Sequence, residues 1–384
     1  PMSILLHGSG GIPTMGAGSG LQFGIGPSEP YVSWWTGQHE NYPNPPTATT
    51  RVPNTSQRRI LHLIDWVTRT FPGVDRERVH MSGASMGGTG ALFFALRYGY
   101  HLSEASSAVG MTAIGLAQSG HQSALEQYWG PKAMALKDDT GMNVWDRYDI
   151  TRALRDDPQV RNIPIHTDSG VNDSIIQFHH ISSASPVSGK SWVQAAQAYK
   201  IGHRIFWDQR EHTTNENSPL PGYWWGQLPQ VATYARNKPF PAFTRSAIDN
   251  VPPAFNASTN SFTGNDARGA LGRFLAWNTS GIVDTHTRLE MPLFVRTEPA
   301  AVFIGAEYPS AGDGYTGPLP IAADVTIRRA QKFLALPWET IHWSFGPLNG
   351  TVNADQDGLI TIPQLPIPGQ TSATTLILRR SSAL

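Results

Sequence analysis

One serine of this chain stands in a context that would make it a nucleophile. Ser85 is the centre of Gly83-Ala84-Ser85-Met86-Gly87, a G-x-S-x-G pattern. A strand-like run at residues 78–82 precedes the pattern and a helical run at residues 91–96 follows it, which is the arrangement that a nucleophile elbow requires. Such a turn exposes a serine hydroxyl at the carboxyl edge of a sheet. The alternative is a glycine-rich connection with an incidental serine.

A serine hydroxyl needs a general base within hydrogen-bond reach, and the base needs a partner that fixes its tautomer. For a sheet of this type the order along the chain is serine, acid, histidine. Downstream of Ser85, the first predicted strand end with a carboxylate in a turn is Asp173, and the next with a histidine is His212. Loops at the carboxyl ends of neighbouring parallel strands converge, so we expect these three side chains to meet. Asp168, inside the predicted strand, is a second candidate acid.

The elements that must position these residues alternate between strands and helices up to about residue 245. This rhythm predicts a mostly parallel sheet covered on both faces. Between the elements, residues 9–55 form a long excursion rich in glycine and proline, which is uncommon unless it binds something. The predicted strands of this part start near residues 4, 78, 163 and 203, and the predicted helices lie near residues 56–70, 91–96 and 190–200.

After about residue 245 the pattern changes to short alternating segments separated by turn residues, without a long amphipathic helix. That spacing predicts an all-β, sandwich-like domain. We therefore divide the chain into an α/β domain at residues 1–245 and a β-sandwich-like accessory domain at residues 246–384.

The motifs resemble those of the α/β-hydrolase superfamily, and within it the feruloyl-esterase and polyhydroxybutyrate-depolymerase-like serine esterases. The elbow is one part of the resemblance. His7-Gly8-Ser9-Gly10-Gly11 is similar to the HG motif of that family, Gly170-Val171-Asn172-Asp173 to the segment that carries its acid, and Asp208-Gln209-Arg210-Glu211-His212 to its histidine turn. The resemblance spans about residues 1–240. The two strands that normally precede the HG motif have no counterpart, so the sheet is expected to be shorter or to have lost its first strands by processing.

The resemblance implies an α/β-hydrolase fold and an acyl-enzyme mechanism. In that mechanism His212 takes the Ser85 proton, Asp173 orients the imidazole, and Ser85 attacks the acyl carbon. The oxyanion hole would come from the backbone N–H of Met86 and from that of Gly8 or Ser9.

Several tryptophans fall near the predicted strand ends, and flat aromatic surfaces suit an aromatic acyl group or a polymer chain. Core packing is the alternative for any single one. We take Trp34, Trp35, Trp224 and Trp225 as candidate substrate-binding residues, with Trp129 and Trp145 as further loop tryptophans.

Metal ligation is not indicated by the sequence. His179-His180 lacks nearby carboxylates at ligand spacing. Asn353–Gly358 is similar to the start of an EF-hand loop, but the twelfth position is Gln364 and the flanks look like strands, so a polar hairpin turn is expected.

Composition bounds the remaining possibilities. The 384 residues hold 29 Lys+Arg against 29 Asp+Glu, so nothing attracts the chain to nucleic acid. The absence of cysteine excludes thiol nucleophiles, thiolate metal sites and disulfides. No apolar run reaches the ~18 residues of a membrane span. The neutral, arginine-rich and aromatic composition favours an extracellular or periplasmic location, although the chain shows no signal peptide.

The sequence thus predicts a cofactor-independent serine carboxylic-ester hydrolase acting on a small-molecule or polymeric ester. Two rivals stay open: a serine peptidase of the prolyl-oligopeptidase type, and a non-catalytic binding protein on a hydrolase scaffold. The ester itself and the oligomeric state are not readable from the residues.

Overall fold

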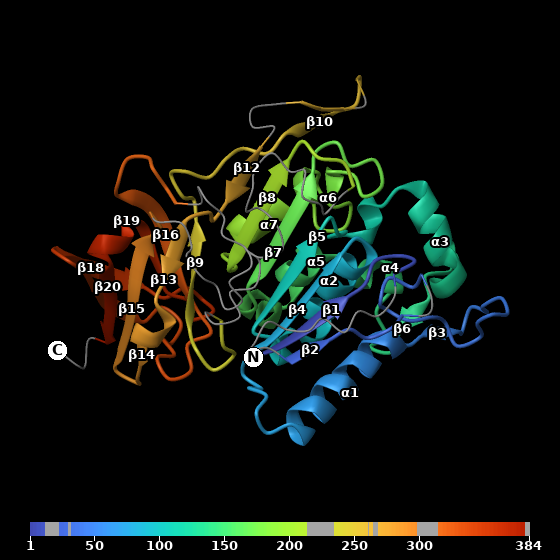
Figure 1. Ribbon diagram of the computed structural model, residues 1–384, viewed down its shortest axis with the longest axis horizontal. Coiled ribbons are helices and arrows are strands. Elements are labelled where there is room, and N and C mark those ends of the chain that lie inside the picture. Colours follow the sequence, from blue (N-terminus) through green and yellow to red (C-terminus); the bar gives the residue numbers. More distant parts are fainter. Residues whose placement is uncertain are drawn as a thin grey trace.

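The structure is a computed structural model that describes residues 1–11, 23–29, 32–212, 234–259, 261–263, 268–297 and 314–380. Figure 1 shows a twisted central sheet with helices packed around it, and beside it a second region built from the C-terminal strands.

Seven strands form the central sheet, in the order β12-β8-β7-β5-β4-β1-β2. Neighbours from β2 to β8 pair in parallel, and only β12 runs antiparallel, against β8. The strands are β1 (Met2–Leu6), β2 (Phe23–Ile25), β4 (Val79–Ala84), β5 (Glu104–Ala108), β7 (Ile165–Gly170), β8 (His203–Asp208) and β12 (Gly269–Leu271). The parallel arrangement gathers the loops after β1, β4, β7 and β8 at one edge, as the motif positions require.

Helices cover the sheet because their apolar positions recur at helical spacing. In α1 (Thr55–Thr70) the side chains of Ile60, Ile64 and Val67 are buried, and α2 (Met86–Tyr98) is buried over most of its length. The other helices are α3 (Ser119–Trp129), α4 (Val144–Arg147), α5 (Ile150–Asp156), α6 (His179–Ser182) and α7 (Trp192–Ala198). Residues 111–160, predicted as helical or irregular, supply α3, α4 and α5.

One face of the sheet carries a buried polar row. His80 and Glu104 are register partners on β4 and β5, and His166 on β7 is the partner of Ser106, two residues beyond Glu104. Glu104 lies 3.2 Å from His80 Nδ1 and 3.1 Å from His166 Nε2, and all three side chains are buried. Because the Glu104 carboxylate is paired with the two histidines, these polar side chains can occupy strands that are usually apolar in a parallel sheet.

The C-terminal region consists of antiparallel strands. One sheet has the order β13-β15-β20-β17-β18, with β14 also paired to β15, and a second has the order β19-β16-β9. Their bounds are β9 (Phe240–Thr244), β13 (Leu275–Trp277), β14 (Val283–Asp284), β15 (Arg288–Val295), β16 (Ile321–Arg328), β17 (Thr340–Phe345), β18 (Leu348–Asn353), β19 (Thr361–Ile367) and β20 (Thr374–Arg380). Side chains from both sheets share one apolar core, separate from that of the central sheet.

Two short strand pairs lie outside these sheets. The excursion at residues 9–55 holds β2, at the edge of the central sheet, and β3 (Arg51–Val52), which pairs in parallel with β6 (Lys137–Asp138). β10 (Ala254–Asn256) and β11 (Ser261–Thr263) form a two-stranded hairpin.

The two regions exchange strands near the predicted boundary at residue 245. β9 precedes that boundary and pairs with β16 of the C-terminal core, whereas β12 follows it and pairs with β8 of the central sheet. Arg328 joins the regions as well, because its Nε donates to the carbonyl of Lys200 at 2.8 Å and its Nη2 to that of Tyr199. The division into residues 1–245 and 246–384 stays a prediction.

The predicted fold class is confirmed: a mainly parallel sheet covered by helices is followed by antiparallel β-structure. One local expectation is wrong. The polar segment Asn353–Gly358 does not form a hairpin turn, because β18 and β19 on either side of it belong to different sheets. Asp355 closes the turn by accepting the N–H of Asp357 and of Leu359, each at 2.9 Å.

Candidate active site

Ser85 stands at the turn between β4 and α2, in a conformation that few residues other than glycine adopt. Its φ is 56° and its ψ is −120°, so the elbow is a strained backbone position of the kind that collects at functional sites. The Ser85 N–H donates to the carbonyl of Ala108 at 2.9 Å, and the Ser85 carbonyl accepts the N–H of Thr89 at 2.9 Å. These bonds tie the turn to β5 on one side and to the first turn of α2 on the other.

Two glycines allow the chain to turn so tightly. A Cβ on Gly83 would stand 2.2 Å from the backbone of Gly87, and a Cβ on Gly87 would stand 1.9 Å from the carbonyl oxygen of Leu6. Neither neighbour is a side chain that could move aside. The G-x-S-x-G pattern is therefore required here by close backbone contact, as the sequence indicated.

Asp173 lies in the loop after β7, and its carboxylate is held by backbone donors. Oδ1 accepts the N–H of Ile175 at 2.8 Å and that of Ile176 at 2.9 Å. The side chain is fully buried, and Oδ2 is left for a third partner.

His212 supplies that third partner. Its Nδ1–H donates to Asp173 Oδ2 at 2.7 Å, and its Nε2 lies 2.8 Å from Ser85 Oγ, close enough to accept the hydroxyl proton. The loop that carries His212 follows β8 and lies against Gly170, where a Cβ would meet the Arg210 carbonyl oxygen at 2.2 Å. The structure thus brings Ser85, His212 and Asp173 into one chain of hydrogen bonds.

The second candidate acid has another partner. Asp168 Oδ1 accepts a hydrogen bond from Arg210 Nη2 at 2.8 Å, and both side chains are buried. Burial raises the pKa of Asp168, although the Arg210 guanidinium opposes that shift. Asp168 therefore braces the loop two residues before His212, whereas the imidazole itself bonds to Asp173.

The residues predicted for the oxyanion hole also lie beside Ser85. Met86 is the first residue of α2, so its N–H is one of the four at a helix start that have no intrahelical acceptor. Gly8 follows β1 and approaches the elbow closely: a Cβ on Gly8 would stand 3.7 Å from Ser85 Cβ. Ser9 is the next residue of the same loop and is exposed.

The candidate tryptophans have different surroundings. Trp35 is completely buried, packs against Gly90, and donates its indole N–H to the His7 carbonyl at 3.1 Å, so its side chain offers no surface to a substrate. Trp34 is also buried, because only 4% of its surface is exposed. Trp224 and Trp225 lie outside the described residues. The placement of Trp129 and Trp145 in loops is wrong: they belong to α3 and α4, and their buried rings meet edge-on.

His121 on α3 interacts with His212 and Asp173, and the sequence did not reveal this placement. Its ring meets the indole of Trp34 edge-on, with centroids 5.3 Å apart. Burial, and then electrostatic interaction with His212, lower the pKa of His121, which favours its uncharged form. Gln118, at the N-terminus of α3, donates to the carbonyl of Ser174 at 2.7 Å and so ties this helix to the loop of the acid. Nothing in the local pattern of residues 111–160 signals this placement.

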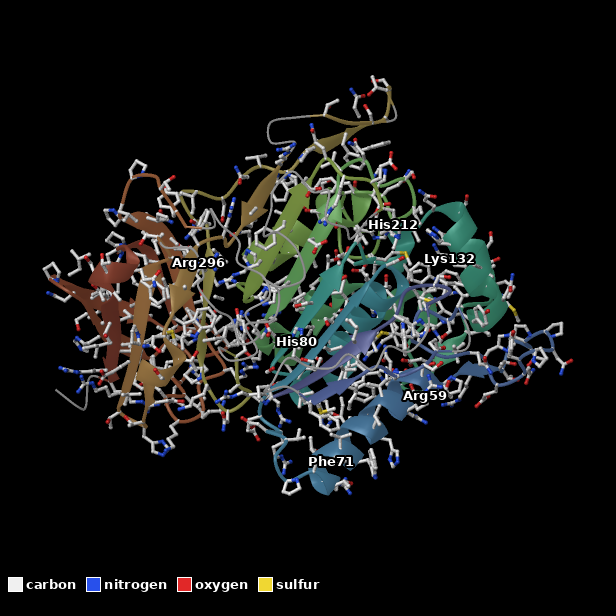
Figure 2. All side chains as sticks on the ribbon, in the orientation of Figure 1. Arg59, Phe71, His80, Lys132, His212 and Arg296 are labelled. Carbon is white, nitrogen blue, oxygen red and sulfur yellow. The ribbon has the colours of Figure 1, made fainter. Side chains whose placement is uncertain are left out.

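Other buried titratable groups lie apart from the triad. Figure 2 shows His212 toward one end of the sheet and His80 toward the other. Burial opposes ionisation of Glu104, but His80 and His166 outweigh it and lower the pKa of the carboxyl to about 2. Among the residues described, no cluster of three or more His, Asp or Glu side chains has an arrangement that would hold a metal ion. His179 hydrogen-bonds Ser183, and His180 is buried beside it on α6.

Comparison with known proteins gives a match to one protein family. A family described as "Putative esterase" matches residues 26–205, just under half of the chain, from the excursion before α1 through to β8. No curated protein sequence shows significant similarity to the chain.

Solved structures that resemble this one include two hydrolases. An S-formylglutathione hydrolase from Agrobacterium tumefaciens is 17% identical, with a TM-score of 0.37, over 56% of this chain and 77% of that one. FphF, a fluorophosphonate-binding serine hydrolase of Staphylococcus aureus, is 17% identical, with a TM-score of 0.37, over 55% of this chain and 76% of that one. The assignment of the fold rests on the sheet order and on the family match.

Proposed function

We propose that the chain is a serine esterase of the α/β-hydrolase superfamily and that Ser85, His212 and Asp173 are its catalytic triad. The observation that carries the proposal is the unbroken path of hydrogen bonds from Asp173 Oδ2 through the imidazole of His212 to Ser85 Oγ, at 2.7 and 2.8 Å. Nucleophile, base and orienting acid stand in the order and at the distances that acyl transfer needs.

The mechanism follows from these contacts. Ser85 Oγ attacks the ester carbonyl carbon while its proton passes to His212 Nε2, and the buried carboxylate of Asp173 stabilises the resulting imidazolium. The imidazolium then protonates the departing alcohol, which leaves an acyl group on Ser85. Water, deprotonated by His212, attacks that acyl group, and the carboxylic acid is released as Ser85 recovers its proton.

The oxyanion of each tetrahedral intermediate is assigned to the backbone N–H of Met86 and to that of Gly8 or Ser9. Two features support this assignment: Met86 begins α2, whose N-terminus favours negative charge, and Gly8 lies against Ser85. Removal of one such donor typically costs about 10²–10³ in turnover.

We further propose an ester with an apolar or aromatic part, including one within a polymer. Ile175 follows the acid by two residues and is 46% exposed, and Phe255 on the β10–β11 hairpin is 37% exposed. Phe255 packs on His179 of α6 with ring centroids 4.2 Å apart, so the hairpin lies over a helix that soon follows the acid loop. Exposed apolar side chains here would favour an apolar substrate over a charged one.

The test compares p-nitrophenyl acetate and butyrate hydrolysis by the native protein and by Ser85→Ala. We expect turnover to fall by about 10⁴ or more in the variant. Ser372→Ala removes an exposed hydroxyl from the C-terminal region and serves as the matched control, with native activity. Equal rates for native protein and Ser85→Ala would exclude the triad.

A second experiment addresses the substrate. Feruloyl, acetyl-xylan, polyhydroxyalkanoate and aromatic polyester substrates are compared by product release, with a peptide anilide beside them. Turnover of the anilide without turnover of any ester would replace the esterase by a serine peptidase. Preference for acetate over every apolar ester would refute the proposed apolar specificity.

A further inference from the structure

The loop His7-Gly8-Ser9 is anchored through its carbonyl oxygens. The His7 carbonyl accepts the indole N–H of Trp35 at 3.1 Å. The Gly8 carbonyl lies 2.8 Å from His7 Nδ1 and also accepts the N–H of Gly11 at 3.1 Å. The C=O and N–H of a trans peptide are fixed in one plane and point in opposite directions. Each anchored carbonyl therefore sets the direction of the next N–H, which belongs to Gly8 in the first peptide and to Ser9 in the second.

The neighbouring chain selects the tautomer of His7 that this anchoring needs. The backbone N–H of Glu29 donates to His7 Nε2 at 3.0 Å. A ring nitrogen that accepts a hydrogen bond carries no proton, so the ring proton of His7 is on Nδ1, where it can be donated to the Gly8 carbonyl. The hydrogen bond from the Glu29 backbone thus leaves His7 Nδ1–H free to donate to the Gly8 carbonyl.

Glu29 is itself held firmly, although the proposed mechanism does not use it. Its carboxylate is 1% exposed and accepts Ser33 Oγ at 2.6 Å, Ser56 Oγ at 3.1 Å and Arg59 Nη2 at 2.9 Å. Ser56 and Arg59 belong to α1, and Figure 2 shows Arg59 on that helix. A buried carboxylate with three donors is a fixed point, and here it ties the segment before the tryptophan pair to α1.

We propose that Glu29, His7 and Trp35 are positioning residues that aim the N–H groups of Gly8 and Ser9 at the oxyanion. The inference rests on the proposed serine mechanism. None of the three touches the substrate in this role: Trp35 holds the first peptide, His7 holds the second, and Glu29 holds His7. Aligned donors matter because electrostatic stabilisation of the oxyanion depends on donors that need no reorganisation during the reaction.

The primary test is a pair of substitutions at His7. His7→Phe keeps a planar ring but cannot donate to Gly8, and we expect kcat for p-nitrophenyl butyrate to fall about 10²-fold with KM changed by less than about threefold. His7→Asn retains a donor near the Nδ1 position and should recover at least about tenfold of that loss. His62→Phe, an exposed histidine on α1, is the matched control and should keep native kinetics.

A transition-state analogue separates positioning from general damage. Ser85 Oγ adds to the carbonyl carbon of an aryl trifluoromethyl ketone, and the serine proton passes to His212. The resulting hemiketal oxyanion lies in the proposed oxyanion hole. We expect its inhibition constant to rise in His7→Phe by the factor by which kcat/KM falls, with little change in the melting temperature. A fall in kcat/KM with unchanged analogue affinity would overturn the inference.

Two further substitutions keep the test decisive if His7→Phe does not fold. Trp35→Phe removes the indole N–H, with the exposed Trp66→Phe as control, and Glu29→Gln removes the charge that Arg59 pairs with. Each should lower kcat about tenfold or more and weaken the analogue in proportion. Native kinetics in every folded variant, while Ser85→Ala is inactive, would refute the positioning role and leave the triad standing. An active Ser85→Ala would instead refute the mechanism.

Discussion

At the residue scale, the structure separates two buried aspartates that the sequence left as rivals. One carboxylate oxygen of Asp173 accepts hydrogen bonds from the backbone and the other accepts one from His212. The carboxylate of Asp168 instead accepts a hydrogen bond from Arg210. The two aspartates differ in which residue of the loop after β8 they contact: Arg210 for Asp168 and His212 for Asp173. Position along the chain favoured Asp173, and the contacts give the physical reason.

We expect Asp173→Asn to lower kcat about 10⁴-fold, because an amide at this place favours the wrong tautomer of His212. Asp168→Asn should cost far less in kcat and act mainly through the Arg210 loop. The measurement is steady-state hydrolysis of p-nitrophenyl butyrate by both variants. A larger loss of kcat in Asp168→Asn would reverse the assignment of the acid.

His121 permits a test of charge beside the base. In the proposed mechanism the imidazole of His212 becomes cationic in the transition state, so His121→Lys should destabilise that cation and lower kcat about tenfold at low salt. Added salt should recover part of the loss. His121→Gln adds no charge and serves as the control. Equal kcat for the two variants would show that no charge at this position reaches His212.

At the element scale, the elbow depends on backbone contacts between β1, β4 and α2. Ser85 keeps its positive φ because the backbones of Gly83, Gly87 and Leu6 pack so closely around the turn that other backbone conformations would clash. Strain at the nucleophile is therefore supported by packing several residues away.

Gly87→Ala tests this support. Its Cβ would stand 1.9 Å from the Leu6 carbonyl oxygen, so we expect unfolding free energy to fall by about 3 kcal/mol or more, with loss of activity. Gly120→Ala on α3 meets no atom within 4 Å and should stabilise the helix by about 0.5 kcal/mol. Urea denaturation measures both. A native-like Gly87→Ala would contradict the tight elbow.

At the scale of the whole molecule, the C-terminal β-structure is joined to the hydrolase sheet by strands and by Arg328. Its guanidinium is buried and donates to two carbonyls at the end of α7, where a cation suits the helix dipole. In the part of the chain that the structure describes, no helix has the length and apolar character to cross a bilayer. The extracellular or periplasmic location stays a prediction.

Arg328→Met should lower the unfolding free energy by about 2–3 kcal/mol, because two carbonyls lose a charged donor in a buried site. Arg69→Met, which removes an exposed side chain paired with Asp65 at 3.4 Å, should change it by less than about 0.5 kcal/mol. Chemical denaturation compares them. Similar stabilities would mean that Arg328 does not hold the regions together.

The buried histidines predict acid sensitivity of the fold. Burial lowers the pKa of His180 from 6.5 to about 3, so between these pH values the unfolded chain binds a proton that the folded chain does not. Stability should therefore fall as the pH drops from 6.5 toward 3. Glu104 adds to this fall at lower pH, because its stabilisation is present above the ordinary carboxyl pKa and is lost as the pH approaches about 2.

His180→Gln should flatten the pH dependence of the unfolding free energy by up to about 1.4 kcal/mol per pH unit in that window. The exposed His62→Gln should leave the slope unchanged. Denaturation at pH 7, 5 and 4 gives both slopes. An unaltered slope in His180→Gln would place the acid sensitivity elsewhere.

The sequence by itself predicted which residues are candidates for the chemistry and at which edge of the sheet they meet. The spacing of strand, elbow and helix around Ser85, and the strand ends before Asp173 and His212, predicted the site because parallel strands share one carboxyl edge. Local pattern also predicted the change to antiparallel structure after residue 245.

Tertiary structure alone decided what surrounds those residues. The surroundings of His121, the position of Glu29 and the burial of Trp35 depend on interactions between residues up to about 90 positions apart, which leave no periodic signal in the chain. The exchange of β9 and β12 between the two regions is of the same kind. The alternation of apolar and polar residues in a strand can be seen in its own sequence. Which strand it pairs with depends on packing in the folded core.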